Sequence, residues 1–133
     1  MTLSTSKAPG RILVIDDDRS ALVLLDRLLT RAGHSVVIVD NAEDGLARMS
    51  EGPFDLLITD KNLPGLDGLE VIRKARTILP SLRTILITGF PTPETREQAK
   101  ELGVFAYVSK PFGVHDILEH CEGAIVASRG SPL

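Results

Sequence analysis

Two sets of carboxylates stand where apolar runs of the sequence end. Asp16, Asp17 and Asp18 follow one such run, and Asp60 follows another. If the ends of these runs meet in space, the carboxylates repel one another unless a cation lies between them. Their hard oxygens suit Mg²⁺, an ion that keeps several waters and accepts phosphate as a further ligand. The pattern therefore predicts a site for a divalent metal and a phosphate group.

Two further polar side chains stand at the ends of later apolar runs. Thr88 ends one run, and Lys110 follows the next. A lysine supplies a positive charge for phosphate oxygens or for the acidic cluster, and a threonine hydroxyl donates a hydrogen bond. Taken alone, each feature has an ordinary explanation. The aspartate run could be a helix N-terminus and Asp60 a turn residue, while Thr88 could be a strand residue and Lys110 a surface lysine. Their joint placement at strand ends favours one shared site.

The elements that must position these residues alternate along the chain. Continuous apolar runs such as Ile12–Ile15 are typical of strands buried on both faces. Five strands, each followed by a helix, predict an α/β fold with an open, doubly wound parallel sheet. In such a sheet the functional groups gather at the carboxyl ends of the strands. The expected strands cover residues 12–15, 35–39, 54–59, 84–88 and 104–108.

Capping and breaking residues delimit the expected helices. Asn41 is expected to cap a helix over 42–51, and Thr92 with Pro93 begins a later one. Gly33 ends the first helix in a left-handed conformation. The last helix follows Gly113, and its core face is expected to carry Val114, Ile117, Leu118, Cys121 and Ile125.

The remaining aromatic and imidazole side chains are assigned no chemistry. The phenylalanines are assigned to the core or its margin, namely Phe54, Phe105 and Phe112. The histidines show no metal-ligand clustering and are expected at the surface or in helices, namely His34, His115 and His120.

Length and composition narrow the class of protein. A chain of 133 residues with 43% apolar and 25% charged residues fits one domain, expected over 11–128, with tails at 1–10 and 129–133. No apolar stretch is long enough for a membrane span or a secretory signal, so we expect a cytoplasmic protein. One cysteine allows no internal disulfide. A net charge of −3 and the absence of tryptophan argue against direct binding of nucleic acid.

These residues, in this order, resemble the receiver domain of two-component response regulators. The resemblance covers about residues 11–128 and is carried by four segments: ILVIDD ending at Asp17, DLLITDKNLPGLDG at 55–68, ILITG at 85–89 and AYVSKPF at 106–112. It implies a flavodoxin-like fold with five helices and a five-stranded sheet of order 2-1-3-4-5, an order for which one of the family is a standard example.

The resemblance implies a role for each residue of the predicted site. Asp60 accepts a phosphoryl group from a histidine kinase or a histidine phosphotransfer protein and becomes an aspartyl phosphate. Asp17, Asp60 and the backbone carbonyl of Asn62 hold Mg²⁺, or Mn²⁺, while Asp16 reaches the ion through water. Lys110 binds a phosphoryl oxygen. The protein thereby catalyses its own phosphorylation and slow dephosphorylation, without turnover of an external substrate.

The resemblance also implies a conformational switch. Thr88 moves its hydroxyl onto the bound phosphoryl group, Tyr107 turns inward, and the Lys110–Pro111 peptide is expected to be cis. The expected output surface is formed by helix four, strand five and helix five, because between Pro93 and Leu102 few apolar residues anchor helix four. It would serve a downstream protein or an attached output domain, and a phosphorylation-dependent homodimer through this face stays open.

Three alternatives share this class of fold. A flavodoxin-like cofactor protein would need aromatic residues for a flavin ring and a phosphate-binding loop, and the loops show neither. A phosphatase of the haloacid dehalogenase type would need a second aspartate at position 62, where this chain has Asn62. The third alternative is a phosphorylation-independent interaction module that resembles a receiver, against which the intact set of site residues argues.

Overall fold

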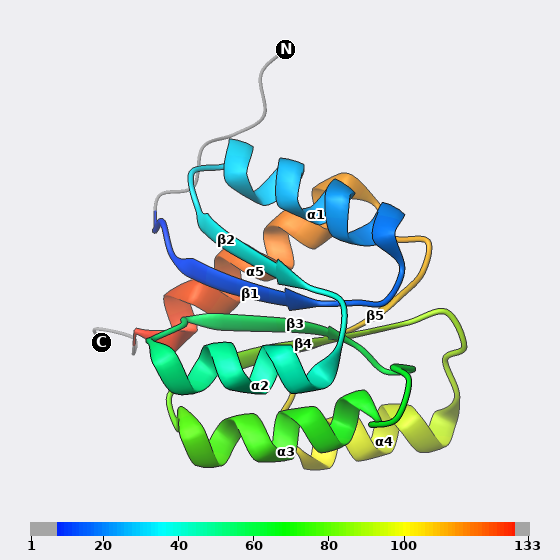
Figure 1. Ribbon diagram of the computed structural model, residues 1–133. Coiled ribbons are helices and arrows are strands. Elements are labelled where there is room, and N and C mark those ends of the chain that lie inside the picture. The colour runs from blue at the N-terminus through cyan, green and yellow to red at the C-terminus, as the bar shows by residue number, and fades with distance from the viewer. Residues whose placement is uncertain (1–7, 130–133) are drawn as a thin grey trace.

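The computed structural model describes residues 8–129, which form one parallel sheet between two layers of helices (Figure 1). The strands lie in the order β2-β1-β3-β4-β5, and all neighbouring pairs are parallel. This confirms the α/β class, the strand order and the five helices within the described residues. The elements are β1 (Arg11–Ile15), α1 (Arg19–Arg31), β2 (Ser35–Val39), α2 (Ala42–Glu51), β3 (Leu56–Asp60), α3 (Gly68–Ile78), β4 (Arg83–Thr88), α4 (Pro93–Glu101), β5 (Ala106–Ser109) and α5 (Val114–Ser128).

Alternate residues of the central strands point to opposite faces of the sheet. Val14 of β1 packs with Leu25 and Ile117 in the core beneath α1 and α5. Leu13 packs with Ile72 in the core beneath α2, α3 and α4. Figure 1 shows the same division, with α1 and α5 on one face and the other three helices on the opposite face. Because helices cover both faces, the strands read as continuous apolar runs.

Several local expectations from the sequence are confirmed. Asn41 caps α2 by accepting a hydrogen bond from the Asp44 amide, and Thr92 caps α4. Gly33 adopts a φ of 106° after α1. Cys121 is buried, and burial raises the pKa of its thiol to about 12. The thiol therefore stays protonated, in keeping with a role in packing. Residues 8–129 contain no helix long and apolar enough to cross a membrane.

Two strands begin two residues later than expected, whereas β1 and β4 each begin one residue earlier. The third strand runs from Leu56 to Asp60, so Asp60 is the last residue of the strand instead of the first residue after it. Phe54 precedes this strand and is buried, with the Arg11 guanidinium 4.7 Å from its ring centroid. The fifth strand begins at Ala106 instead of residue 104, because Val104 still donates its amide hydrogen to the α4 carbonyl of Ala99.

Two apolar residues are exposed, namely Val114, which was assigned to the core, and Phe105, which was assigned to the core or its margin. Val114 has 40% of its surface exposed, because it begins α5, in which burial starts only at Ile117. Phe105 has 42% exposed, and its ring lies over Gly123 of α5, where an added Cβ would be 3.1 Å from the ring. Both expectations were wrong because a helical or strand pattern does not show where an element extends beyond its neighbour.

His34 was expected at the surface or in a helix, and that expectation is wrong. It lies between α1 and β2 with only 6% of its surface exposed, and its Nδ1 accepts a hydrogen bond of 3.0 Å from the Gly10 amide. Burial lowers the pKa of His34, and nearby Arg129 acts in the same direction, against Glu122 and Asp55. Gly10, assigned to the N-terminal tail, is thus part of the folded structure, whereas residues 1–7 and 130–133 lie outside the described residues.

The lowered pKa of His34 gives the free energy of unfolding a pH dependence. Below about pH 6.5 the unfolded imidazole binds a proton that the folded one does not, so stability is lost as pH falls through the folded pKa. We expect His34→Gln to reduce the loss of stability between pH 7.5 and pH 5, measured by urea unfolding. The exposed His115→Gln variant should keep the native dependence. Equal pH profiles for His34→Gln and the native protein would contradict this account.

Candidate active site

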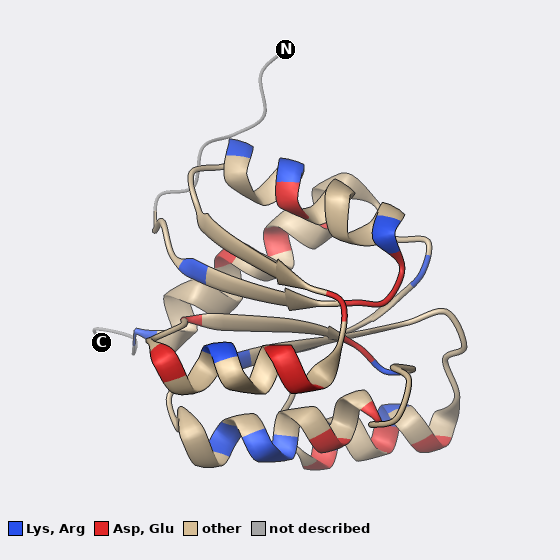
Figure 2. Cartoon of the chain, viewed as in Figure 1, with Lys and Arg blue, Asp and Glu red and all other residues tan. Residues whose placement is uncertain are grey.

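The strand register brings the predicted site residues to one edge of the sheet. β1 and β3 are neighbours, and Asp16 directly follows β1 while Asp60 ends β3. On the other side of β3, Asp60 lies opposite Ile87, which precedes Thr88 at the end of β4. Figure 2 shows the acidic segments at the ends of β1 and β3 on the same edge. The carboxyl ends of the strands therefore form a candidate active site.

Lys110 connects the two buried carboxylates of this site. Its Nζ lies 2.8 Å from Asp16 Oδ2 and 3.2 Å from Asp60 Oδ2. Burial disfavours the charged form of Lys110, but its contacts with both carboxylates outweigh this effect and raise the pKa of the lysine. It follows Ser109, the last residue of β5, and precedes a cis peptide bond to Pro111, the geometry that the family resemblance implied.

The carboxylates form a group of metal-ligand type. Oxygens of Asp16, Asp17 and Asp60 all lie within 4.8 Å of one another. Asp16 and Asp60 are buried, whereas Asp17 is exposed, so one side of the group is open to water. Burial raises the pKa of Asp16, and its bond to Lys110 opposes this. Hard oxygen ligands with access for water suit Mg²⁺ or Mn²⁺.

Asp18 takes a different part from its two neighbours. Its carboxylate accepts hydrogen bonds from the amides of Ser20 and Ala21 and caps α1. Its own amide donates to Asp16 Oδ1 at 2.9 Å. The ordinary explanation for the aspartate run, a helix N-terminus, thus holds for Asp18, while Asp16 and Asp17 contribute to the site.

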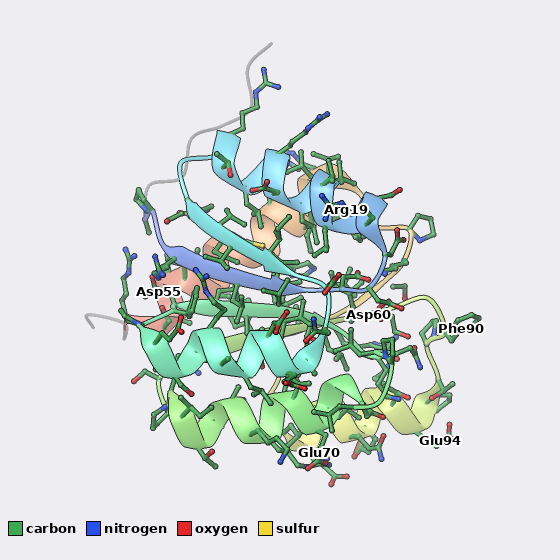
Figure 3. The ribbon with its side chains drawn as sticks, in the orientation of Figure 1. Arg19, Asp55, Asp60, Glu70, Phe90 and Glu94 are labelled. Carbon is green, nitrogen blue, oxygen red and sulfur yellow. The ribbon has the colours of Figure 1, made fainter. Side chains whose placement is uncertain are left out.

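Asn62 connects Asp60 to Thr88. The backbone N–H of Asn62 donates a hydrogen bond of 3.1 Å to Asp60 Oδ1. The Thr88 hydroxyl donates one of 3.3 Å to the side-chain oxygen Oδ1 of Asn62. Thr88 is fully buried, and its oxygen also accepts a hydrogen bond from the Phe90 amide. Phe90 itself projects from the β4–α4 loop and is 79% exposed (Figure 3). In this state the Thr88 hydroxyl is bonded to Asn62 and not to Asp60.

Tyr107 lies on β5 beneath α4. Its register partner is Leu86 of β4, and its ring packs against the core on the α4 side. The Arg96 guanidinium of α4 lies 4.9 Å from the ring centroid, a cation–π contact. The buried hydroxyl has no hydrogen-bond partner among the described residues. The side chain is thus attached to α4 through its ring and has an unused hydrogen-bonding group.

The chain is similar to known proteins over most of its length. Residues 12–122 match the response regulator receiver domain family. The chain belongs to this family. The crystal structure of a CheY-like receiver domain protein from Methanospirillum hungatei JF-1 has a TM-score of 0.86 at 30% identity, covering 91% of this chain and 97% of that one.

Relatives of this receiver domain differ in length. The response regulator receiver protein CpdR of Brucella abortus (strain 2308) is 36% identical over 124 residues, which are 89% of this chain and 98% of CpdR. The DNA-binding transcriptional regulator NtrC of Azospirillum brasilense is 37% identical over 114 residues, which are 86% of this chain but 24% of NtrC. The chain thus matches nearly all of one relative and about a quarter of the other.

Sequence reasoning missed two features of the receiver's β3–α3 loop. Gly68 starts α3 so close to β3 that an added Cβ would lie 2.2 Å from the Asp60 carbonyl oxygen. Lys61 and Asp67 form an ion pair of 2.7 Å across the loop. The available signal was Gly68 itself, because a glycine is used where two segments of the chain approach closely. The ion pair left no signal in the sequence pattern.

The close approach of α3 to Asp60 predicts a large effect of a single methyl group. Gly68→Ala should lower the free energy of unfolding by about 1–3 kcal/mol, because the backbone of α3 or β3 must shift. Gly52→Ala is the matched control, since a Cβ there meets nothing within 4 Å. Urea unfolding of both variants measures the difference. A Gly68→Ala variant as stable as Gly52→Ala would show that the contact can relax without strain.

Proposed function

We propose that this receiver domain accepts a phosphoryl group on Asp60 from the phosphohistidine of a kinase or phosphotransfer protein. A carboxylate oxygen of Asp60 forms the new O–P bond while the P–N bond to the donor imidazole breaks, and the imidazole nitrogen keeps the electron pair. The observation that carries the proposal is the position of Asp60 between an ammonium group and two further carboxylates.

The side chains around Asp60 have separate tasks in this reaction. Lys110 Nζ already lies 3.2 Å from Asp60 Oδ2, so it can bind an oxygen of the phosphoryl group once that group is attached to Asp60. Asp17, Asp60 and the backbone carbonyl of Asn62 would hold Mg²⁺, and Asp16 would reach the ion through water. The ion would neutralise negative charge on the transferring phosphoryl group. The exposed side of Asp17 leaves room for the donor and for water. The site would then hold both reactants in line.

The same site supports a switch. Once a phosphoryl oxygen is present, the Thr88 hydroxyl exchanges its bond to Asn62 for a stronger one to that oxygen. Of α4, only Thr95 and Ala99 are buried, so little apolar burial opposes a displacement of this helix. Arg96 attaches the helix to the ring of Tyr107. We therefore place the output surface on α4, β5 and α5, for a downstream protein, an attached output domain or a second copy.

The proposal includes a cellular setting. Transfer from a kinase phosphohistidine takes place in the cytoplasm, and the single cysteine, which is buried, agrees with a chain that needs no oxidising compartment.

The acceptor is tested by intact mass after incubation with acetyl phosphate, with and without Mg²⁺. We expect the native protein to gain the mass of one phosphoryl group only with Mg²⁺, and Asp60→Asn to gain none. Asp26→Asn, on α1, is the control and should be labelled like the native protein. A native protein that stays unlabelled beside a labelled reference receiver would favour the alternative of a phosphorylation-independent interaction module.

Tyr107 makes the switch observable without an added probe. The chain has one tyrosine and no tryptophan, so its tyrosine emission reports on Tyr107 alone. We expect labelling to reduce quenching of this emission by acrylamide, because an inward turn covers the half-buried ring. Thr88→Val keeps the side-chain volume but lacks the hydroxyl, so it should be labelled without this change. Equal quenching before and after labelling of the native protein would contradict the switch.

A further inference from the structure

The β3–α3 loop carries Asn62 and is closed by an ion pair of unequal exposure. Lys61 Nζ lies 2.7 Å from Asp67 Oδ2, and the lysine side chain is only 17% exposed, against 45% for the aspartate. A second ion pair on α3, between Glu70 and Arg73, is 2.8 Å long but exposed on both sides, at 43% and 47%. Of these four side chains only Lys61 is shielded from water, so loss of Asp67 would leave a largely buried charge without its partner.

The two residues of this pair stand at the two ends of the loop. The Lys61 amide donates to the β4 carbonyl of Ile87, and the Lys61 carbonyl accepts from the Gly68 amide. Asp67 uses its other oxygen, Oδ1, to cap α3 at the Leu69 amide. The ion pair therefore joins a residue fixed to the sheet with the N-cap residue of α3, and it encloses residues 62–66.

Within this enclosed segment, Asn62 has contacts to the site on two sides. Its amide bonds to Asp60 Oδ1 and its side chain to the Thr88 hydroxyl. A shift of the loop would move the Asn62 backbone, and with it the carbonyl that would face the metal. A ligand that is a backbone carbonyl is positioned both by the hydrogen bonds of its own residue and by the contacts that hold the loop around it.

We propose that Lys61 and Asp67 are positioning residues, whose ion pair holds the Asn62 carbonyl in place for a divalent cation. This inference rests on the proposed function, because it concerns the metal of the same site. Neither residue touches the reacting atoms. Their pairing sets the affinity for the cation by fixing the loop that presents one of its ligands.

The test is a charge-neutral double variant, Lys61→Met with Asp67→Asn. Asparagine still caps a helix, and the net charge near the site is unchanged, so only the ion pair is lost. We expect the affinity for Mg²⁺, measured by isothermal titration calorimetry, to fall about 10-fold, at the low end of the range for residues behind metal ligands. Lys61→Met alone should also bind less tightly, whereas a purely Coulombic role of Lys61 predicts tighter binding.

The matched control is the equally charge-neutral pair Glu70→Gln with Arg73→Met. Glu70 lies on α3, apart from Asp60 (Figure 3), and this variant should bind Mg²⁺ as the native protein does. Hydrogen exchange of the metal-free proteins gives a second readout. Amides in 62–67 should exchange faster in the Lys61/Asp67 double variant and at the native rate in the control.

The outcomes separate the inference from the proposed function. A native protein that binds Mg²⁺ and is labelled, together with a Lys61/Asp67 double variant of native affinity or native exchange, would overturn only the positioning role. A native protein that binds no Mg²⁺ would overturn the metal part of the proposed function and the positioning role with it. Weaker binding together with faster loop exchange, absent from the control, supports the inference.

Discussion

One ammonium group holds two buried carboxylates together at the edge of the sheet. Lys110 Nζ contacts both Asp16 and Asp60, and Asp17 adds a third carboxylate nearby. Removing one partner of such a buried set costs about 3–5 kcal/mol, because a charge is left without compensation. One lysine does not balance three carboxylates, and the pKa of Asp16 is raised first by the burial of its own carboxylate and then by the nearby charge of Asp60. The arrangement therefore favours a further cation and, with it, a phosphoryl group.

The strand order and the loops after the strands together position this contact. Because β3 lies between β1 and β4 in the parallel sheet, the ends of the three strands meet at one edge. The loops that follow add the finer positions: the cis peptide after Lys110, the Asn62 loop and the start of α3 at Gly68. The helix that follows β4, α4, is held by few buried side chains and by the contact of Arg96 with the ring of Tyr107. The weakly attached α4 thus follows β4, the strand that ends at Thr88 of the site.

Much of this could be predicted from the sequence, because strands buried on both faces read as unbroken apolar runs and the site residues stand directly at their ends. The caps of α2 and α4 were predictable for the same local reason. His34, Val114 and Phe105 were not, since their exposure depends on which neighbouring element covers them. The ion pair of Lys61 with Asp67 was not predicted either, because a loop lacks the regular spacing of residues that shows which side chains of a helix or strand face each other. The roles of the site residues came from family resemblance, and the structure adds their distances.

The most direct test of the account is a crystal structure with Mg²⁺ and beryllium trifluoride, an analogue of the phosphoryl group. The account predicts that the analogue is bound to Asp60 and that the ion is held by Asp17, Asp60 and the backbone carbonyl of Asn62. Lys110 and Thr88 should each contact a fluorine atom of the analogue. Beryllium trifluoride bound at another residue, or Lys110 still joining Asp16 to an unmodified Asp60 at saturating analogue, would contradict it.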